Sequence, residues 1–246
     1  MVAPKDDFER QVLMTLRGPL WFEGLLNDKI DLTPEEWSML IDTTYTGSKH
    51  EDNMMSTIGR LRTLLQRARR NRATKAQSHD VVDELWHCHD VLKGVVAGQK
   101  ERLLGYEALF VDDATKPVEG IVHAALQAAY GIGMVVAIVG NTILRALDPE
   151  DTLLIVESTQ MAVDTLALAD AASRYRPLGS GYIALCLGAA WVGVIDEDLK
   201  AKLEAKWMEW GPDFIGGLDK VPIREMNWTQ RQLLLLDIQT ESTEIT

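Results

Sequence analysis

Cysteine is scarce in this sequence, with only Cys88 and Cys186 among 246 residues. The first ten residues are mostly polar and do not resemble a secretory signal. Few cysteines and no signal segment indicate a reducing, intracellular compartment. We therefore expect a cytoplasmic protein, and a chain of this length can bury a sizeable core without disulfides or metals.

Positive charge is outnumbered as well, since 25 lysines and arginines face 37 aspartates and glutamates and leave a formal net charge of -12. The phosphates of nucleic acids and of anionic lipids repel an acidic chain, so we expect no direct nucleic-acid binding. Residues 60–75 are a local exception, because seven basic residues occur there without an acid. Such a run is typical of a solvated helix face followed by a loop, or of an intramolecular partner for acidic surface.

Charge is missing altogether from residues 120–144, a stretch long enough to cross a bilayer. The stretch nevertheless contains His123, Gln127, Asn141 and Thr142, and it lacks the aromatic belt and basic flank of most membrane spans. This pattern favours a buried core helix, and we expect no membrane span.

Strand-like alternation of apolar and polar residues is lacking over any useful length, whereas apolar residues recur at helical spacing along the chain. Helices are predicted over residues 8–16, 34–45, from 54 through the basic run, 78–109, 117–147, 149–173, 182–195, 196–207 and 228–238, with a turn over 47–53. The link over 148–151 is very short, so the two long helices that it joins should pack antiparallel.

The sequence therefore predicts an all-α fold: a single multi-helix bundle with two long antiparallel central helices. We expect one domain over residues 1–246, because neither a linker nor a repeat divides the chain. Within it, N-terminal helices in 1–76 should pack on a core formed by 77–238, and residues 239–246 should be a frayed tail.

Two stretches carry a likeness to a known family: RGPLWFEGLLNDKIDLTPEEW over residues 17–37 and RYRPLGSGYIALCLGAAW over residues 174–191. Both resemble the C-terminal helical regulatory region of fungal binuclear zinc-cluster transcription factors. The resemblance implies an all-α fold that holds a small effector or contacts partner proteins. DNA contacts in that family come from a separate module whose six cysteines bind two zinc ions. Two cysteines cannot form that cluster, so DNA binding by this route is excluded.

Polar residues form one row on the long uncharged helix. His123, Gln127 and Tyr130 follow each other at helical spacing, and Asn141 lies five full turns beyond His123. These four residues, here called the polar seam, share a face with Met134. Polar groups in so apolar a helix need partners in neighbouring helices, in water or in a ligand.

Two interpretations of the polar seam stay open. In the first, the seam is internal structure, because antiparallel pairing would bring Asn141 near Glu157 and Met134 near Asp164. In the second, the seam lines an elongated apolar pocket with a few orienting donors, which is the usual composition of a small-molecule site.

The segment over residues 86–90 contains His87 and His89, which together suggest a metal site. Successive helical residues point about 100° apart, so these two imidazoles diverge by about 200° and cannot chelate one ion. We expect no metal and no cofactor.

Other catalytic patterns are weak. Cys186 stands among leucines and is expected in the core. Residues 179–181 follow Arg174 and Arg176 and could bind an anion, but they lack the spacing and the lysine of a phosphate loop and favour a helix–helix turn. No hydrolase or metalloprotease signature is present.

We therefore predict a stand-alone biosynthetic protein that binds a hydrophobic terpenoid or polyketide intermediate. It would promote cyclisation or isomerisation, including steps of the Diels–Alder type, as a cofactor-independent enzyme. The candidate catalytic residues are His123, Gln127, Tyr130 and Asn141, and the candidate ligand-binding residues are Met134, Glu157 and Asp164. The alternative is a regulator that does not bind DNA and instead binds a small effector or a zinc-cluster transcription factor, in which case a nuclear location is expected. Homodimerisation stays open in both.

Overall fold

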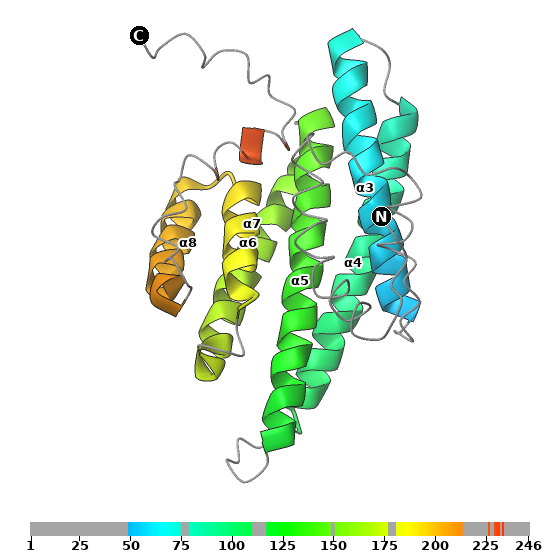
Figure 1. Ribbon diagram of the computed structural model, residues 1–246. Coiled ribbons are helices and arrows are strands. Elements are labelled where there is room, and N and C mark those ends of the chain that lie inside the picture. Colours follow the sequence, from blue (N-terminus) through cyan, green and yellow to red (C-terminus); the bar gives the residue numbers. More distant parts are fainter. Residues whose placement is uncertain are drawn as a thin grey trace, which may run out of the picture. The chain divides into compact units, whose positions relative to one another are not determined.

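Helices account for nearly all residues that the computed structural model describes, namely 49–74, 79–109, 117–148, 151–176, 181–213 and 226, 229–231 and 233. No strand occurs in these segments (Figure 1), which confirms the predicted all-α fold. The chain divides into two units, Met1–Val91 and Leu92–Thr246. The helices predicted over 8–16 and 34–45, the first stretch of the family resemblance and the tail after 239 lie outside the described residues, as does most of 228–238.

The first unit contains α3 (Lys49–Thr74) and the beginning of α4 (His79–Glu107). The turn predicted over 47–53 is wrong from Lys49 onward, where α3 has already begun. The sequence EDN in this stretch is compatible with a helix start as well as with a turn, because acidic residues are favourable near a helix N-terminus. The predicted helix over 78–109 corresponds to α4.

Apolar residues of both helices form the interior of the first unit. The residues buried on α3 and on the first part of α4 are Leu61, Leu64, Leu65, Ala68, Val81, Leu85 and Cys88. Arg67 of the basic run pairs with Asp80 at 2.5 Å and with Glu84 at 2.9 Å, so this arginine is an intramolecular partner for acidic residues. His89 is buried and His87 is exposed, as expected for neighbours that diverge around a helix.

The second unit begins within α4 and contains the long helices of the fold. They are α5 (Pro117–Leu147) and α6 (Thr152–Ala172), followed by the short 3-10 helix η1 (Ser173–Tyr175). The bounds of α5 are those predicted. Helix α6 begins at Thr152 instead of 149, because the carboxylate of Asp151 caps it by accepting hydrogen bonds from the amides of Leu153 and Leu154.

Two further helices and a final turn complete the described part of this unit: α7 (Ile183–Gly193), α8 (Glu197–Trp210) and the 3-10 turn η3 (Gly211–Asp213). Asp196 caps α8 through the amide of Leu199, as its position before an amphipathic segment predicted. Figure 1 shows α8 next to the α6 and α7 pair, and these three helices contact one another.

Helix α5 is the centre of the second unit, and it contacts both α6 and α7. Every residue from 133 to 145 is buried, including Val135, Ile143 and Leu144 without any exposed surface. Its hydrogen-bond partners on α6 run in the opposite direction along the chain, from Leu154 opposite Asn141 to Asp164 opposite Tyr130. The two central helices are therefore antiparallel, as predicted.

Among the described residues, α5 and α6 are long and apolar enough to cross a membrane by length and composition. The corresponding segments are Val118–Leu147, which is 56% buried over its most apolar window, and Thr152–Tyr175, which is 33% buried. Core helices of globular proteins meet the same criterion, so this finding alone does not indicate a span.

Candidate functional site

The polar seam of α5 lies against α6, and two of its members bond to the acidic residues of that helix. The Nδ2 group of Asn141 donates to Glu157 Oε2 at 3.1 Å and to the backbone oxygen of Leu154 at 3.0 Å. The hydroxyl of Tyr130 donates to Asp164 Oδ2 at 2.9 Å. Asn141 therefore meets Glu157 as antiparallel pairing predicted, whereas the partner of Asp164 on α5 is Tyr130.

Two lysines of α4 complete these contacts, and the sequence did not point to them. Lys93 Nζ lies 2.8 Å from Glu157 Oε1, and Lys100 Nζ lies 2.6 Å from Asp164 Oδ2. Both the lysines and the carboxylates are seven residues apart, so two equivalent three-helix contacts repeat along the bundle. The equal spacing of the two lysines on α4 and of the two carboxylates on α6 was the sequence signal that could have identified these ion pairs.

Asp164 is held in its charged form. Burial favours the neutral acid, but hydrogen bonds from Lys100, Gln160 and Tyr130 outweigh it and lower the pKa of Asp164 below its ordinary value. Burial and the bond to Asp164 together raise the pKa of Tyr130, so its hydroxyl remains a donor at neutral pH. The Tyr130–Asp164 contact is thus a stable structural hydrogen bond.

His123, at the other end of the seam, also has partners within the second unit. Its Nδ1 lies 2.5 Å from the hydroxyl of Tyr175, and its Nε2 lies 2.9 Å from Glu107 Oε1. The ring of Tyr106 stacks on the imidazole with centroids 6.1 Å apart. His123 is only 3% exposed, so these neighbours enclose it.

Gln127 differs from the other members of the seam. Its side chain has no exposed surface, and in the part of the chain that the structure describes neither Oε1 nor Nε2 has a hydrogen-bond partner. Leaving a buried polar group unpaired costs about 1–3 kcal/mol. Gln127 has two such atoms on one amide. Its hydrogen-bonding groups are therefore the least satisfied in the polar seam.

Tyr182, which directly precedes α7, carries a second polar group without a partner in the described segments. Gly131 lies one turn beyond Gln127, and a Cβ atom at Gly131 would be 2.9 Å from Tyr182 Cε2 and 2.9 Å from Cys186 Sγ. Among the described residues, the buried hydroxyl of Tyr182 has no hydrogen-bond partner, and burial raises its pKa. It is therefore a second unsatisfied polar group, and its ring lies beside α5 at Gly131. Cys186 is buried, as expected.

Met134 is buried to 1% exposure between the two ends of the seam. The amide oxygen of Asn141 has no partner within the described segments. Among the described residues, no group of three or more histidine, cysteine, aspartate or glutamate side chains could hold a metal ion.

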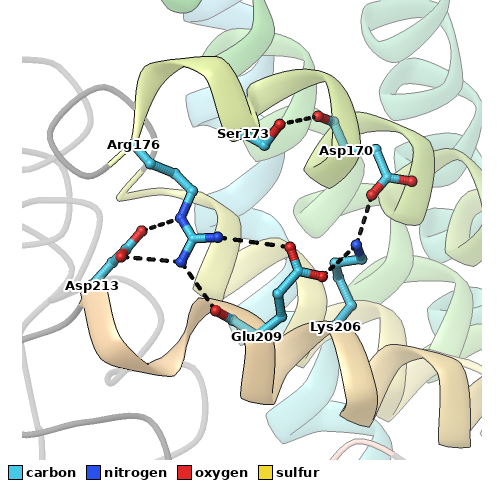
Figure 2. Close-up of polar contacts among 6 residues, drawn as sticks. All are labelled: Asp170, Ser173, Arg176, Lys206, Glu209 and Asp213. Carbon is cyan, nitrogen blue, oxygen red and sulfur yellow. Dashed lines mark hydrogen bonds and ion pairs between the residues drawn. The ribbon is translucent and has the colours of Figure 1, made fainter.

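The arginine ahead of α7 has a structural role (Figure 2). Arg176 binds Asp213 through Nε at 2.5 Å and through one terminal nitrogen at 3.1 Å, and that nitrogen also donates to the backbone oxygen of Glu209. Lys206 adds ion pairs to Asp170 at 2.7 Å and to Glu209 at 2.6 Å. Arg176 therefore ties the end of α6 to α8 and η3, while residues 179–180 of the suggested anion site lie outside the described part.

No protein-family model matches the chain, and neither a curated protein nor a solved structure matches it.

Proposed function

We propose that the protein binds a hydrophobic small molecule of the terpenoid or polyketide type within the helices of the second unit, beside Gln127, and promotes its cyclisation or isomerisation without a cofactor. The observation that carries this proposal is the fully buried amide of Gln127, which has no partner at either polar atom among the described residues. A ligand carbonyl or hydroxyl would provide the missing hydrogen bonds. The hydroxyl of Tyr182 offers a second donor or acceptor.

Ring closure or isomerisation of a flexible polyene needs neither a nucleophile nor a metal. Apolar walls that hold the chain in its reactive fold lower the entropic part of the barrier. A hydrogen bond from Gln127 Nε2 to a conjugated carbonyl would stabilise the negative charge that develops on oxygen in the transition state. His123, Tyr130 and Asn141 contribute indirectly in this proposal, because their contacts with Glu107, Asp164 and Glu157 keep α4, α5 and α6 in place.

A regulator of the zinc-cluster type is the second candidate, and it uses the same site. Most of helix α7 falls within the second stretch of the family resemblance, and its Cys186 approaches Gly131 of α5, one turn from Gln127. An effector bound there would be retained unchanged. Binding without turnover therefore favours the regulator, and turnover favours the enzyme.

The test replaces Gln127 by Leu, which has a similar size and no polar atoms. Because the amide is unpaired, the substitution removes a desolvation cost, and we expect an equal or higher melting temperature. Pseudoionone, a linear terpenoid ketone that can cyclise to an isomer of the same mass, serves as the probe. Binding followed by tryptophan fluorescence, and ring closure followed by gas chromatography, should both weaken about tenfold or more when the hydrogen bond is lost.

Tyr130→Phe is the matched control, because it removes a hydroxyl that bonds to Asp164 on the same helix face. We expect a lower melting temperature with unchanged pseudoionone binding for this variant. Tyr182→Phe should resemble Gln127→Leu, with weaker binding and no loss of stability. Equal binding by the Gln127 and Tyr130 variants, or a lower melting temperature of Gln127→Leu without a change in binding, contradicts the proposed site.

A further inference from the structure

Arg145 is a buried cation near the C-terminal end of α5. Its side chain is 5% exposed, and its only hydrogen bond among the described residues runs from a terminal nitrogen to the hydroxyl of Ser158 at 2.9 Å. Ser158 is itself buried and donates to the backbone oxygen of Ile155. The guanidinium has five N–H donors, and one neutral hydroxyl satisfies only a small part of them.

Other arginines of this chain show how their charge is normally balanced. Arg67 pairs with two carboxylates, and Arg176 binds Asp213 and lies within 3.6 Å of Glu209 (Figure 2). These two side chains are more exposed than Arg145, so water also solvates them. Arg145 has less water and, in the described part of the chain, no carboxylate within ion-pair distance.

Nearby groups do not supply the missing charge. Burial lowers the pKa of Arg145, and no charge among the described residues opposes this effect. The C-terminal end of α5 contributes a partial negative charge of about half a unit, which favours a cation there without completing its hydrogen bonds. Buried charges in proteins are otherwise paired, because leaving one unpaired is costly.

We infer that Arg145 binds the carboxylate of an organic acid with an apolar body. A carboxylate presents two oxygens that match the planar fork of a guanidinium. A phosphate dianion would leave an excess negative charge in a buried site, whereas a carboxylate balances the single charge of Arg145. The helix segments that carry Arg145 and its partner Ser158 support an apolar body, since Leu144 on α5 and Leu154 on α6 are at most 1% exposed.

This site is separate from the one proposed around Gln127. Arg145 follows Gln127 by eighteen residues on the same helix, which corresponds to about 27 Å along the axis. A small molecule does not reach both places, so each proposal can fail without the other.

Thermal unfolding and calorimetric titration of the full chain with octanoate test the inference, with octanol and inorganic phosphate at the same ionic strength as comparison ligands. We expect octanoate alone to raise the melting temperature in a saturable way. Arg145→Met should abolish that response, and its own melting temperature without ligand should be equal to or above that of the wild type, because it removes a largely buried cation that has no carboxylate partner in the described part of the chain. Arg102→Met removes an exposed arginine and should retain the full response.

Arg145→Lys guards against a failure of the Met variant to fold. It keeps the charge but loses the bidentate geometry, so octanoate affinity should fall about tenfold or more. The inference is wrong if octanoate does not stabilise the wild type, if octanol or phosphate stabilises it equally, or if either Arg145 variant binds octanoate as well as Arg102→Met does.

Discussion

Asp164 shows how one carboxylate can join three helices. It accepts hydrogen bonds from Lys100 of α4, from Tyr130 of α5 and from Gln160 of its own helix. A carboxylate that gains such donors on folding is more acidic in the folded than in the unfolded chain, as the lowered pKa of Asp164 reflects. Its contribution to stability therefore depends on pH.

Asp164→Asn is expected to lower the free energy of unfolding by about 1–3 kcal/mol at pH 7, because an amide cannot accept all three bonds as a charged group does. A lowered folded pKa gives stability that is complete above the unfolded value of about 3.9 and disappears as pH falls through the folded value. Urea unfolding at pH 7 and pH 3 measures the effect, which should shrink at pH 3. The exposed Asp90→Asn is the control and should have little effect at either pH. An equal loss at both pH values would show that the charge of Asp164 does not matter.

The neighbours of a single residue were predictable from sequence where the geometry of one helix determines its position. Helical spacing placed His123, Gln127, Tyr130 and Asn141 on one face, and the short link to α6 placed Glu157 beside Asn141. Lys93, Lys100, Glu107 and Tyr175 could not be identified in this way. Their contacts depend on the rotation of α4 and of the end of α6 about their axes, which is set by packing among several helices.

The absence of a partner for Gln127 and the lack of a carboxylate beside Arg145 were still less accessible from sequence. Both depend on every side chain that surrounds these residues in the described part of the chain. Helical spacing within one segment does not predict which side chains those are. These two side chains carry the ligand proposals because Gln127 has no hydrogen-bond partner, and Arg145 has no carboxylate partner, in the described part of the chain.

At the scale of elements, strong local signals fixed most helix boundaries. The bounds of α5, and the capping of α8 by Asp196, agree with proline and aspartate preferences at helix starts. The start of α3 was missed because residues 47–53 look like a turn by composition, whereas their acidic residues suit a first helical turn. Local propensity is a weak guide where polar residues can adopt either structure.

Glycines in α5 offer a test of how closely the elements pack. A methyl group at Gly131 would lie 2.9 Å from Tyr182 Cε2 and 3.0 Å from Leu168 Cδ2, which is closer than side chains normally approach. Overpacking of this kind costs about 1–3 kcal/mol, which exceeds the gain of up to about 1 kcal/mol that alanine brings to a helix interior. Gly131→Ala should therefore lower the free energy of unfolding measured in urea.

Gly98→Ala is the matched control for this prediction. Gly98 lies in the interior of α4, and nothing within 4 Å would contact an added methyl group. Only the propensity gain applies, so Gly98→Ala should stabilise the protein by up to about 1 kcal/mol. Opposite signs for the two substitutions are expected, and a stabilising Gly131→Ala would mean that α7 does not pack closely on α5.

At the scale of the whole molecule, the fold class was predictable because the evidence accumulates over many residues. Apolar residues recur at helical spacing along the chain, and no segment of the sequence shows a competing strand pattern. The division into Met1–Val91 and Leu92–Thr246 was not foreseen, since its boundary falls inside α4 where no linker composition marks it. The predicted single domain over 1–246 and the resemblance to zinc-cluster regulators stay predictions.

The apolar central helices α5 and α6 lead to a last prediction, which concerns whether the protein dissolves in water or needs detergent. Residues 133–145 of α5 are all buried by the protein itself, so lipid is not needed to cover them. Helix α6 exposes Leu153, Val156 and Val163, but Gln160 and Asp170 are exposed on the same helix, and polar groups of this kind are costly in a bilayer. We therefore expect the purified chain to remain in solution without detergent and to give a helical far-UV circular dichroism spectrum that detergent does not change. Gel filtration and circular dichroism with and without a mild detergent check this expectation. A strict detergent requirement for solubility or for the helical signal would instead assign α5 and α6 to a membrane.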